Sequence, residues 1–169
     1  LPLLQNLQKK GSSGGKRHIR ALVLVPTREL AAQVEESIAT YGRYLDFKSM
    51  VIFGGVNINP QFKKLRAGVD IVVATPGRLM DHMSQGTIKL DRIETLILDE
   101  ADRMLDMGFI RDIRRIVNAV PTSRQTLLFS ATFSHEIREL AKDFMVYPEE
   151  IQVAKRNETA AKVAQIIHP

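Results

Sequence analysis

The sequence predicts an α/β domain in which helices cover both faces of a parallel β-sheet, giving three layers. Short apolar runs alternate along the chain with longer segments whose apolar residues recur at helical spacing. Strands and helices that alternate in this way build parallel sheets. Several of the runs, such as residues 21–25 and 96–98, are continuously apolar, as expected of strands that are buried on both faces.

Composition narrows the class of protein. The 169 residues suffice for one domain with a sizeable core, and 44% hydrophobic with 25% charged residues is ordinary for a globular domain. The net charge of +5 permits a polyanionic partner without requiring one. The chain has no cysteine, which excludes disulfides, thiolate zinc sites and cysteine nucleophiles. No apolar run approaches the roughly 20 residues that span a bilayer, so we expect no membrane segment.

The first elements are a helix and a flexible loop. Residues 2–10 carry leucines at helical spacing, and residues 11–17 are rich in glycine and serine. The loop is not a P-loop, because that pattern needs a glycine where Lys10 stands and a serine or threonine where Arg17 stands. The leucine-rich start has no methionine and no basic stretch before it. It is therefore not a signal peptide, and we expect it to be an interior part of a longer chain.

The remaining elements follow from periodicity. Apolar runs predict strands at residues 21–25, 49–53, 69–74, 95–98, 126–129 and 150–153. An apolar stripe predicts an amphipathic helix that Thr27 can cap, marked by Leu30, Val34, Ile38, Tyr41 and Leu45. Further helices are expected after Arg78, after the acids that follow residue 98, over 109–120 and over 137–144. The chain from 154 onward is polar and is interpreted as a linker.

Each strong strand ends in a short polar or glycine-containing turn. These turns are Pro26-Thr27-Arg28, Gly54-Gly55, Thr75-Pro76-Gly77-Arg78, Asp99-Glu100-Ala101-Asp102 and Ser130-Ala131-Thr132. In a parallel sheet they share one edge, where open α/β sheets bind their ligands. Glycine amides, helix N-termini and the two arginines can bind phosphate oxygens there. The acids can hold Mg²⁺ and polarise a water beside a nucleotide phosphate.

Each of these features also has a purely structural interpretation. The acids can offset the dipole of a following helix, and the other turns can be helix caps or simple turns. The four histidines, His18, His82, His135 and His168, show no metal-ligand spacing and are expected to be bystanders. Four arginines, Arg103, Arg111, Arg114 and Arg115, are interpreted as a solvated helix face.

Taken together, the five turns resemble, in order and spacing, the motifs of the first RecA-like domain of DEAD-box ATP-dependent RNA helicases. The segment from Arg103 to Phe109 resembles the bacterial RhlE-like branch of that family. The resemblance implies that Asp99 holds the Mg²⁺ of ATP and that Glu100 positions the attacking water. It implies that Asp102, Ser130 and Thr132 couple nucleotide state to RNA grip. It also implies an RNA-backbone surface made of Pro26, Thr27, Arg28, Gly54, Gly55, Thr75, Pro76, Gly77 and Arg78.

Three parts of that family's pattern do not occur in the sequence. The adenine-reading Q motif and the Walker A loop belong upstream of residue 1, and a second RecA-like domain with its arginine finger belongs downstream. Residues 1–153 are therefore expected to be a partial RecA-like ATP-binding domain, and 154–169 a linker to the second domain. The parent would be a cytoplasmic ATP-dependent RNA helicase, and this chain alone would be inactive.

Without the strand that feeds the P-loop, the strand at 126–129 is expected to have an unpaired edge beside a gap in the core.

Two other function classes remain open. The first is a non-catalytic RNA-binding or partner-binding piece that uses the same sheet edge. The second is a phosphoacceptor or Mg²⁺-sensing α/β domain built on the acids, which leaves the other turns unexplained.

Overall fold

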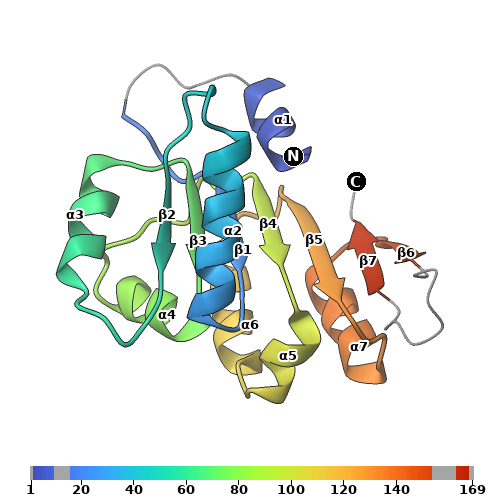
Figure 1. Ribbon diagram of the computed structural model, residues 1–169. Helices are drawn as coiled ribbons and strands as arrows, with labels where there is room; N and C mark the ends of the chain where they lie inside the picture. The colour runs from blue at the N-terminus through green and yellow to red at the C-terminus, as the bar shows by residue number, and fades with distance from the viewer. Residues whose placement is uncertain (1, 10–15, 154–162, 168–169) are drawn as a thin grey trace.

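A seven-stranded sheet with the order β2-β3-β1-β4-β5-β7-β6 runs through the molecule (Figure 1). The computed structural model describes residues 2–9, 16–153 and 163–167. The first five strands in that order are parallel to one another. The strand β7 pairs antiparallel with β5, and β6 pairs antiparallel with β7. The strands are β1 (Ala21–Leu24), β2 (Ser49–Ile52), β3 (Ile71–Ala74), β4 (Thr95–Leu98), β5 (Gln125–Ser130), β6 (Glu149–Val153) and β7 (Val163–Ile167).

Helices cover both faces of the sheet, so the predicted fold class is confirmed (Figure 1). The helices are α1 (Pro2–Lys9), α2 (Arg28–Tyr41), α3 (Asn59–Ala67), α4 (Pro76–Ser84), α5 (Ala101–Asp106), α6 (Ile110–Ala119) and α7 (His135–Phe144). The larger core packs one face of the sheet against α4 to α7. Two smaller cores pack the other face against α1 and α2. None of the helices within the described ranges is both long and apolar enough to cross a membrane.

Parallel register brings the carboxyl ends of the central strands to one level. Leu24 at the end of β1 is paired with Ala74 of β3 on one side and with Leu98 of β4 on the other. The ladder continues one residue beyond the strands, because the Val25 N–H donates to the Ala74 carbonyl at 3.0 Å and the Asp99 N–H to the Leu24 carbonyl at 2.9 Å. The turns that follow these strands therefore start at the same height.

One helix was not predicted from the sequence. The helix α3 has a proline in its first turn and Lys64 and Arg66 in its last, which are ordinary start and stop signals. Its only fully buried residue is the polar Gln61, so it lacks the apolar stripe by which the other helices are recognised. The amphipathic helices over 109–120 and 137–144 are confirmed as α6 and α7.

The expected unpaired edge of β5 is wrong, whereas the linker role of residues 154–169 stays a prediction. The strand β7 pairs antiparallel with β5, from Leu127 opposite Ile167 to Ser130 opposite Ala164, and β6 pairs with β7 in turn. An open strand edge offers free amides and carbonyls to any segment of suitable β-propensity, and the Val-Ala-Gln-Ile-Ile sequence of β7 is such a segment. Residues 154–162 lie outside the described ranges.

A substitution in β7 tests this pairing. Gln165 lies opposite Phe129 of β5 and Ile151 of β6, so Gln165→Pro removes a backbone donor from the middle of the ladder. We expect the free energy of unfolding to fall by about 1–3 kcal/mol relative to Gln165→Ala, measured by urea denaturation. Equal stability of the two variants would show that β7 does not pair with β5.

Candidate active site

The acid-containing turn follows β4 and begins with a strained residue. Glu100 has φ 50° and ψ 51°, in the left-handed region, which costs a residue with a side chain about 1–2 kcal/mol. Its backbone N–H donates to Asp99 Oδ1 at 2.9 Å. The helix α5 then begins at Ala101, which is fully buried together with Met104 and so fixes the start of the helix. Packing therefore holds Glu100 in the left-handed conformation, and the carboxylates of Asp99 and Glu100 leave the turn in different directions.

Asp99 lies partly buried at the end of an apolar groove of about 370 Å³ between α1, α2 and the sheet. The sheet contributes Val23, Ile97, Leu127 and Phe129, and the helices contribute mainly aliphatic side chains. Burial raises the pKa of the Asp99 carboxyl, the hydrogen bond from the Glu100 N–H opposes that change, and the negative charge of Glu100 adds to it. Leu127 and Phe129 of β5 form one side of this groove, and its origin in a missing strand stays a prediction.

The end of β5 lies against the acid turn. Thr132 Oγ1 donates to Asp102 Oδ2 at 3.4 Å, which joins the segment after β5 to the helix after β4. Ser130 is 2% exposed, and its Oγ has no hydrogen-bond partner among the described residues. A buried hydroxyl without a partner costs free energy, so this oxygen is positioned to bond a group that arrives from outside the chain. Asp102, Ser130 and Thr132 were predicted to act together. In the structure Asp102 contacts Thr132, and the Ser130 hydroxyl has no partner among the described residues.

A second group of turns lies at the other side of β1. Gly55 has φ +80°, and a Cβ built on it would lie 3.3 Å from Arg28 Nη1. The Arg28 side chain is 56% exposed, with Nε at 3.5 Å from Glu29 Oε1. The guanidinium after β1 therefore lies against the glycine turn after β2, and it remains open to solvent. The glycine is needed both for its left-handed backbone and for this close approach.

Arg78 lies differently from Arg28. Its Nη2 donates to the Val56 carbonyl at 3.0 Å, its Nε lies 3.7 Å from Asp81, and its side chain is 13% exposed. Arg78 Nη1 is buried without a partner among the described residues. The guanidinium therefore ties the start of α4 to the loop that follows Gly54-Gly55, with one nitrogen left to bond a further acceptor.

A buried histidine supports the same turn. His82 is fully buried, with Nδ1 at 2.8 Å from Thr87 Oγ1 and Nε2 at 2.8 Å from Gln61 Oε1. Gln61 Nε2 in turn donates to the carbonyl of Phe53, which precedes Gly54. Burial lowers the pKa of His82, and the charge of Arg78 lowers it further. His82, expected from the sequence to be a bystander, thus has a structural role. Its pairing with Gln61 joins α4 to α3, and no local sequence pattern predicts such a contact between two helices.

The other predicted site residues shape the turns. Thr27 Oγ1 accepts the Leu30 N–H at 3.2 Å and so caps α2, while Pro26 and Pro76 are buried. Thr75 is partly buried and Gly77 is exposed. Across the described ranges, no group of three histidine or acidic side chains is arranged to hold a metal ion. Asp99, Glu100 and Asp102 are thus neighbours in sequence that do not form a single ligand cage.

Residues 1–140 match the family model described as DEAD/DEAH box helicase. The chain belongs to this family. Its acid turn, Asp99-Glu100-Ala101-Asp102, spells the four letters of the DEAD box. A solved structure of a DEAD box protein from the hyperthermophile Methanococcus jannaschii superposes with a TM-score of 0.73 and 46% identity, covering 78% of this chain and 36% of that one. The expected RecA-like fold class is confirmed by this match.

Curated relatives carry the same family name. The DEAD-box ATP-dependent RNA helicase CshA of Streptococcus pneumoniae (serotype 4, strain TIGR4) is 45% identical over 165 residues, which are 98% of this chain and 30% of the relative. The ATP-dependent RNA helicase CshA of Listeria monocytogenes is 42% identical, over 98% of this chain and 31% of the relative. The DEAD-box chain thus spans about a third of the length of these relatives. The RhlE-like branch stays a prediction.

The strain at Glu100 can be measured with two truncations of the same side chain. Glu100→Gly and Glu100→Ala both remove the carboxylate, but only glycine adopts φ 50° without steric cost. We expect the glycine variant to be more stable by about 1 kcal/mol, after allowance for its greater freedom in the unfolded chain. Chemical denaturation measures the difference. A more stable alanine variant would mean that the turn is not strained.

Proposed function

We propose that the chain is part of an ATP-dependent RNA helicase. It supplies one edge of the nucleotide site and one edge of the RNA groove. The observation that carries the proposal is the division of the carboxyl edge of the sheet. The acids and hydroxyls after β4 and β5 lie together on one side of β1, with Asp102 and Thr132 in contact. The arginine and glycine turns after β1, β2 and β3 lie on the other side. The names of the curated relatives include both ATP dependence and RNA helicase activity.

Asp99 fits a Mg²⁺ ion that is held mainly by phosphates and water. Mg²⁺ is usually bound through one or two carboxylates together with substrate phosphates, so a three-carboxylate cage is not needed. Asp99 Oδ1 is engaged by the Glu100 N–H, which leaves Oδ2 for the ion or its water. A nearby cation also favours the charged form of a carboxyl whose pKa burial has raised. Bound there, Mg²⁺ would neutralise charge on the transferring phosphoryl group.

Glu100 is proposed as the residue that orients the attacking water. Its side chain is 43% exposed, and its nearest ion-pair partner, Arg103, lies 4.0 Å away. A carboxylate so weakly engaged can accept a hydrogen bond from a water and hold it in line with the phosphoryl group. The left-handed turn separates this carboxylate from Asp99, so one can bind water while the other faces the metal.

The contact between Asp102 and Thr132 is proposed to couple the nucleotide to RNA. It joins the segment after β5 to the helix that carries the acids, so a shift at the nucleotide can pass to Ser130 and Thr132. On the other side of β1, Arg28 is exposed against Gly55 and can pair with RNA phosphates without reading bases. Arg78 would act there largely through the Val56 loop that it holds.

The rest of the nucleotide site is proposed to come from parts of the parent outside these 169 residues. The sequence contains no Gly-x₄-Gly-Lys-Ser/Thr pattern to cradle phosphates, and the apolar groove beside Asp99 is open to further chain. We propose that in the parent the strand leading to the P-loop pairs with β5, where β7 pairs in this chain. The proposal also includes a linker over residues 154–169, a second RecA-like domain after residue 169 and a cytoplasmic location.

The role of Glu100 is testable in the full-length parent. Glu100→Gln should lower RNA-stimulated ATP turnover about 10²–10⁴-fold, since it removes water activation, while ATP and RNA affinities change less than twofold. Steady-state hydrolysis and equilibrium binding of a labelled nucleotide provide the measurement. The control is Glu36→Gln, the same change on the exposed face of α2. Parallel losses of binding and turnover would assign Glu100 a structural role instead.

A further inference from the structure

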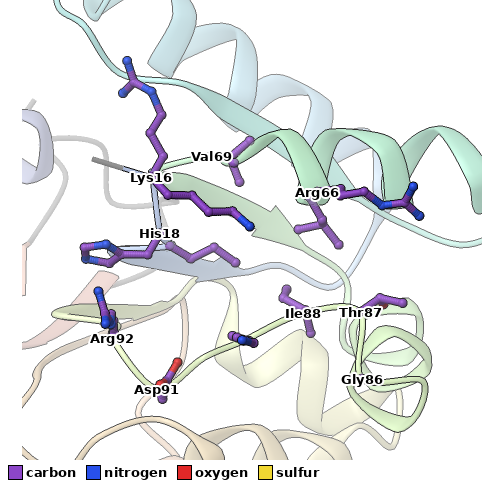
Figure 2. Close-up of a pocket in the computed structure, with 14 residues that line it drawn as sticks. Lys16, His18, Arg66, Val69, Gly86, Thr87, Ile88, Asp91 and Arg92 are labelled. Carbon is purple, nitrogen blue, oxygen red and sulfur yellow. The ribbon is translucent and has the colours of Figure 1, made fainter. Parts of the chain in front are cut away.

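A second cavity, of about 420 Å³, lies at the opposite edge of the sheet (Figure 2). Its walls are residues 16–19, which lead into β1, the end of α3 with residues 68 and 69 before β3, and residues 86–92 between α4 and β4. All three segments precede strands whose carboxyl ends carry the DEAD-box motifs. The cavity is therefore separated from the candidate active site by the length of the strands.

The cavity is rich in cations that have no ion-pair partner within the described part of the chain. Lys16, Arg66, Lys89 and Arg92 are exposed, and none of these four forms an ion pair with another described residue. Arg17 differs, because its guanidinium is held by Asp46 at 2.7 Å and by Asp70 at 2.6 Å. The one carboxylate in the lining is that of Asp91. Unpaired positive charge thus dominates the wall.

The interior of the cavity combines an apolar floor with an unsatisfied polar atom. Ile19, Val69 and Ile88 are 5–8% exposed and form the floor. His18 Nδ1 is buried and has no hydrogen-bond partner among the described residues. In Figure 2, Lys16 extends between the wall with Arg66 and Val69 and the wall with Ile88, while His18 and Arg92 lie toward one end. A ligand here would meet positive charge from several directions.

Helix dipoles oppose this charge only weakly. The helices α3 and α4 both end at the cavity, and each helix C-terminus carries about half a negative charge. Their last carbonyls are already bonded, since the Gly68 N–H donates to the Lys64 and Leu65 carbonyls and the Gly86 N–H to the Met83 carbonyl. Four full positive charges at the rim therefore outweigh the two dipole ends and Asp91.

We propose that this cavity binds backbone phosphates of a single RNA strand, as a second RNA contact remote from the active edge. The inference rests on the proposed function in one respect, that RNA is the polyanion with which the parent works. The cations come from three separate segments around an opening larger than one phosphate, which suits an extended polyanion better than a single ion. Lysine and arginine contacts to phosphate carry no base preference, so binding would be independent of sequence.

The test removes two of the four cations from one segment of the 169-residue chain. Lys89→Gln/Arg92→Gln is compared with Arg111→Gln/Arg115→Gln, which removes the same charge from the exposed face of α6. Fluorescence anisotropy with labelled single-stranded RNA is measured over a range of salt concentrations. The slope of log affinity against log salt should become shallower by about 1.4 for the cavity variant, and affinity should fall about tenfold at low salt. The control should change less than twofold.

Crosslinking and competition identify the ligand. RNA carrying 4-thiouridine should crosslink to residues 16–19 or 86–92 of the wild-type chain. Equal RNA affinity of the cavity and control variants would overturn the inference, and so would undetectable RNA binding by the wild-type chain at low salt. The competition experiment uses tripolyphosphate as the probe. If tripolyphosphate binds through Lys89 and Arg92 and RNA does not, the inference is overturned, and the ligand of the cavity is a small polyphosphate.

The inference and the proposed function fail in different ways. If Arg28→Ala abolishes RNA binding and the cavity variant retains it, the cavity is not an RNA site, and the assignment of the active edge is unaffected. If the cavity variant loses RNA affinity but Glu100→Gln in the parent leaves ATP turnover unchanged, the cavity binds RNA and the assigned role of Glu100 is wrong.

Discussion

The parallel register of β1 with β3 and β4 is the constraint on which the rest of the structure depends. Because these three strands pair residue for residue, their carboxyl ends are level, and the turns after them meet at one edge. Backbone hydrogen bonds from Val25 and Asp99 extend the ladder into the turns themselves. Burial enforces this register, since all four residues of β1 and of β3 are buried and neither strand has a solvent face to exchange.

This edge is built from components that would be unfavourable elsewhere. Glu100 is held in the left-handed region by the buried start of α5, and Asp99 is partly buried beside apolar side chains. The buried hydroxyl of Ser130 has no hydrogen-bond partner among the residues that the structure describes. Strain and unsatisfied polar groups persist only where the surrounding structure enforces them, and they concentrate at functional sites. On the other side of β1, His82 and Gln61 brace the glycine turn through the Phe53 carbonyl. The half with the acids thus combines backbone strain with an unsatisfied hydroxyl. Hydrogen bonds brace the other half, where Arg78 Nη1 also lacks a partner among the described residues.

The structural features that could be predicted from the sequence depend mostly on neighbouring residues. Continuous apolar runs marked the parallel strands, and the turns after them marked the site, because both signals lie within a few neighbouring residues. The helix α3 was missed since it buries a glutamine where an apolar stripe is usual. The strand β7 was missed because its formation depends on the distant edge of β5. The inward turn of Arg78 onto Val56 and the gathering of Lys16, Arg66 and Arg92 around one cavity depend on tertiary packing, which no local pattern encodes.

We propose that this chain holds one edge of a nucleotide and RNA site that other parts of the parent complete. The most direct measurement compares RNA-stimulated ATP hydrolysis by the 169-residue chain and by the full-length parent at equal concentrations. We expect stimulated turnover by the parent and none by the chain, together with ATP binding by the chain that is too weak for calorimetry. Hydrolysis by the chain alone, or micromolar ATP affinity, would contradict it.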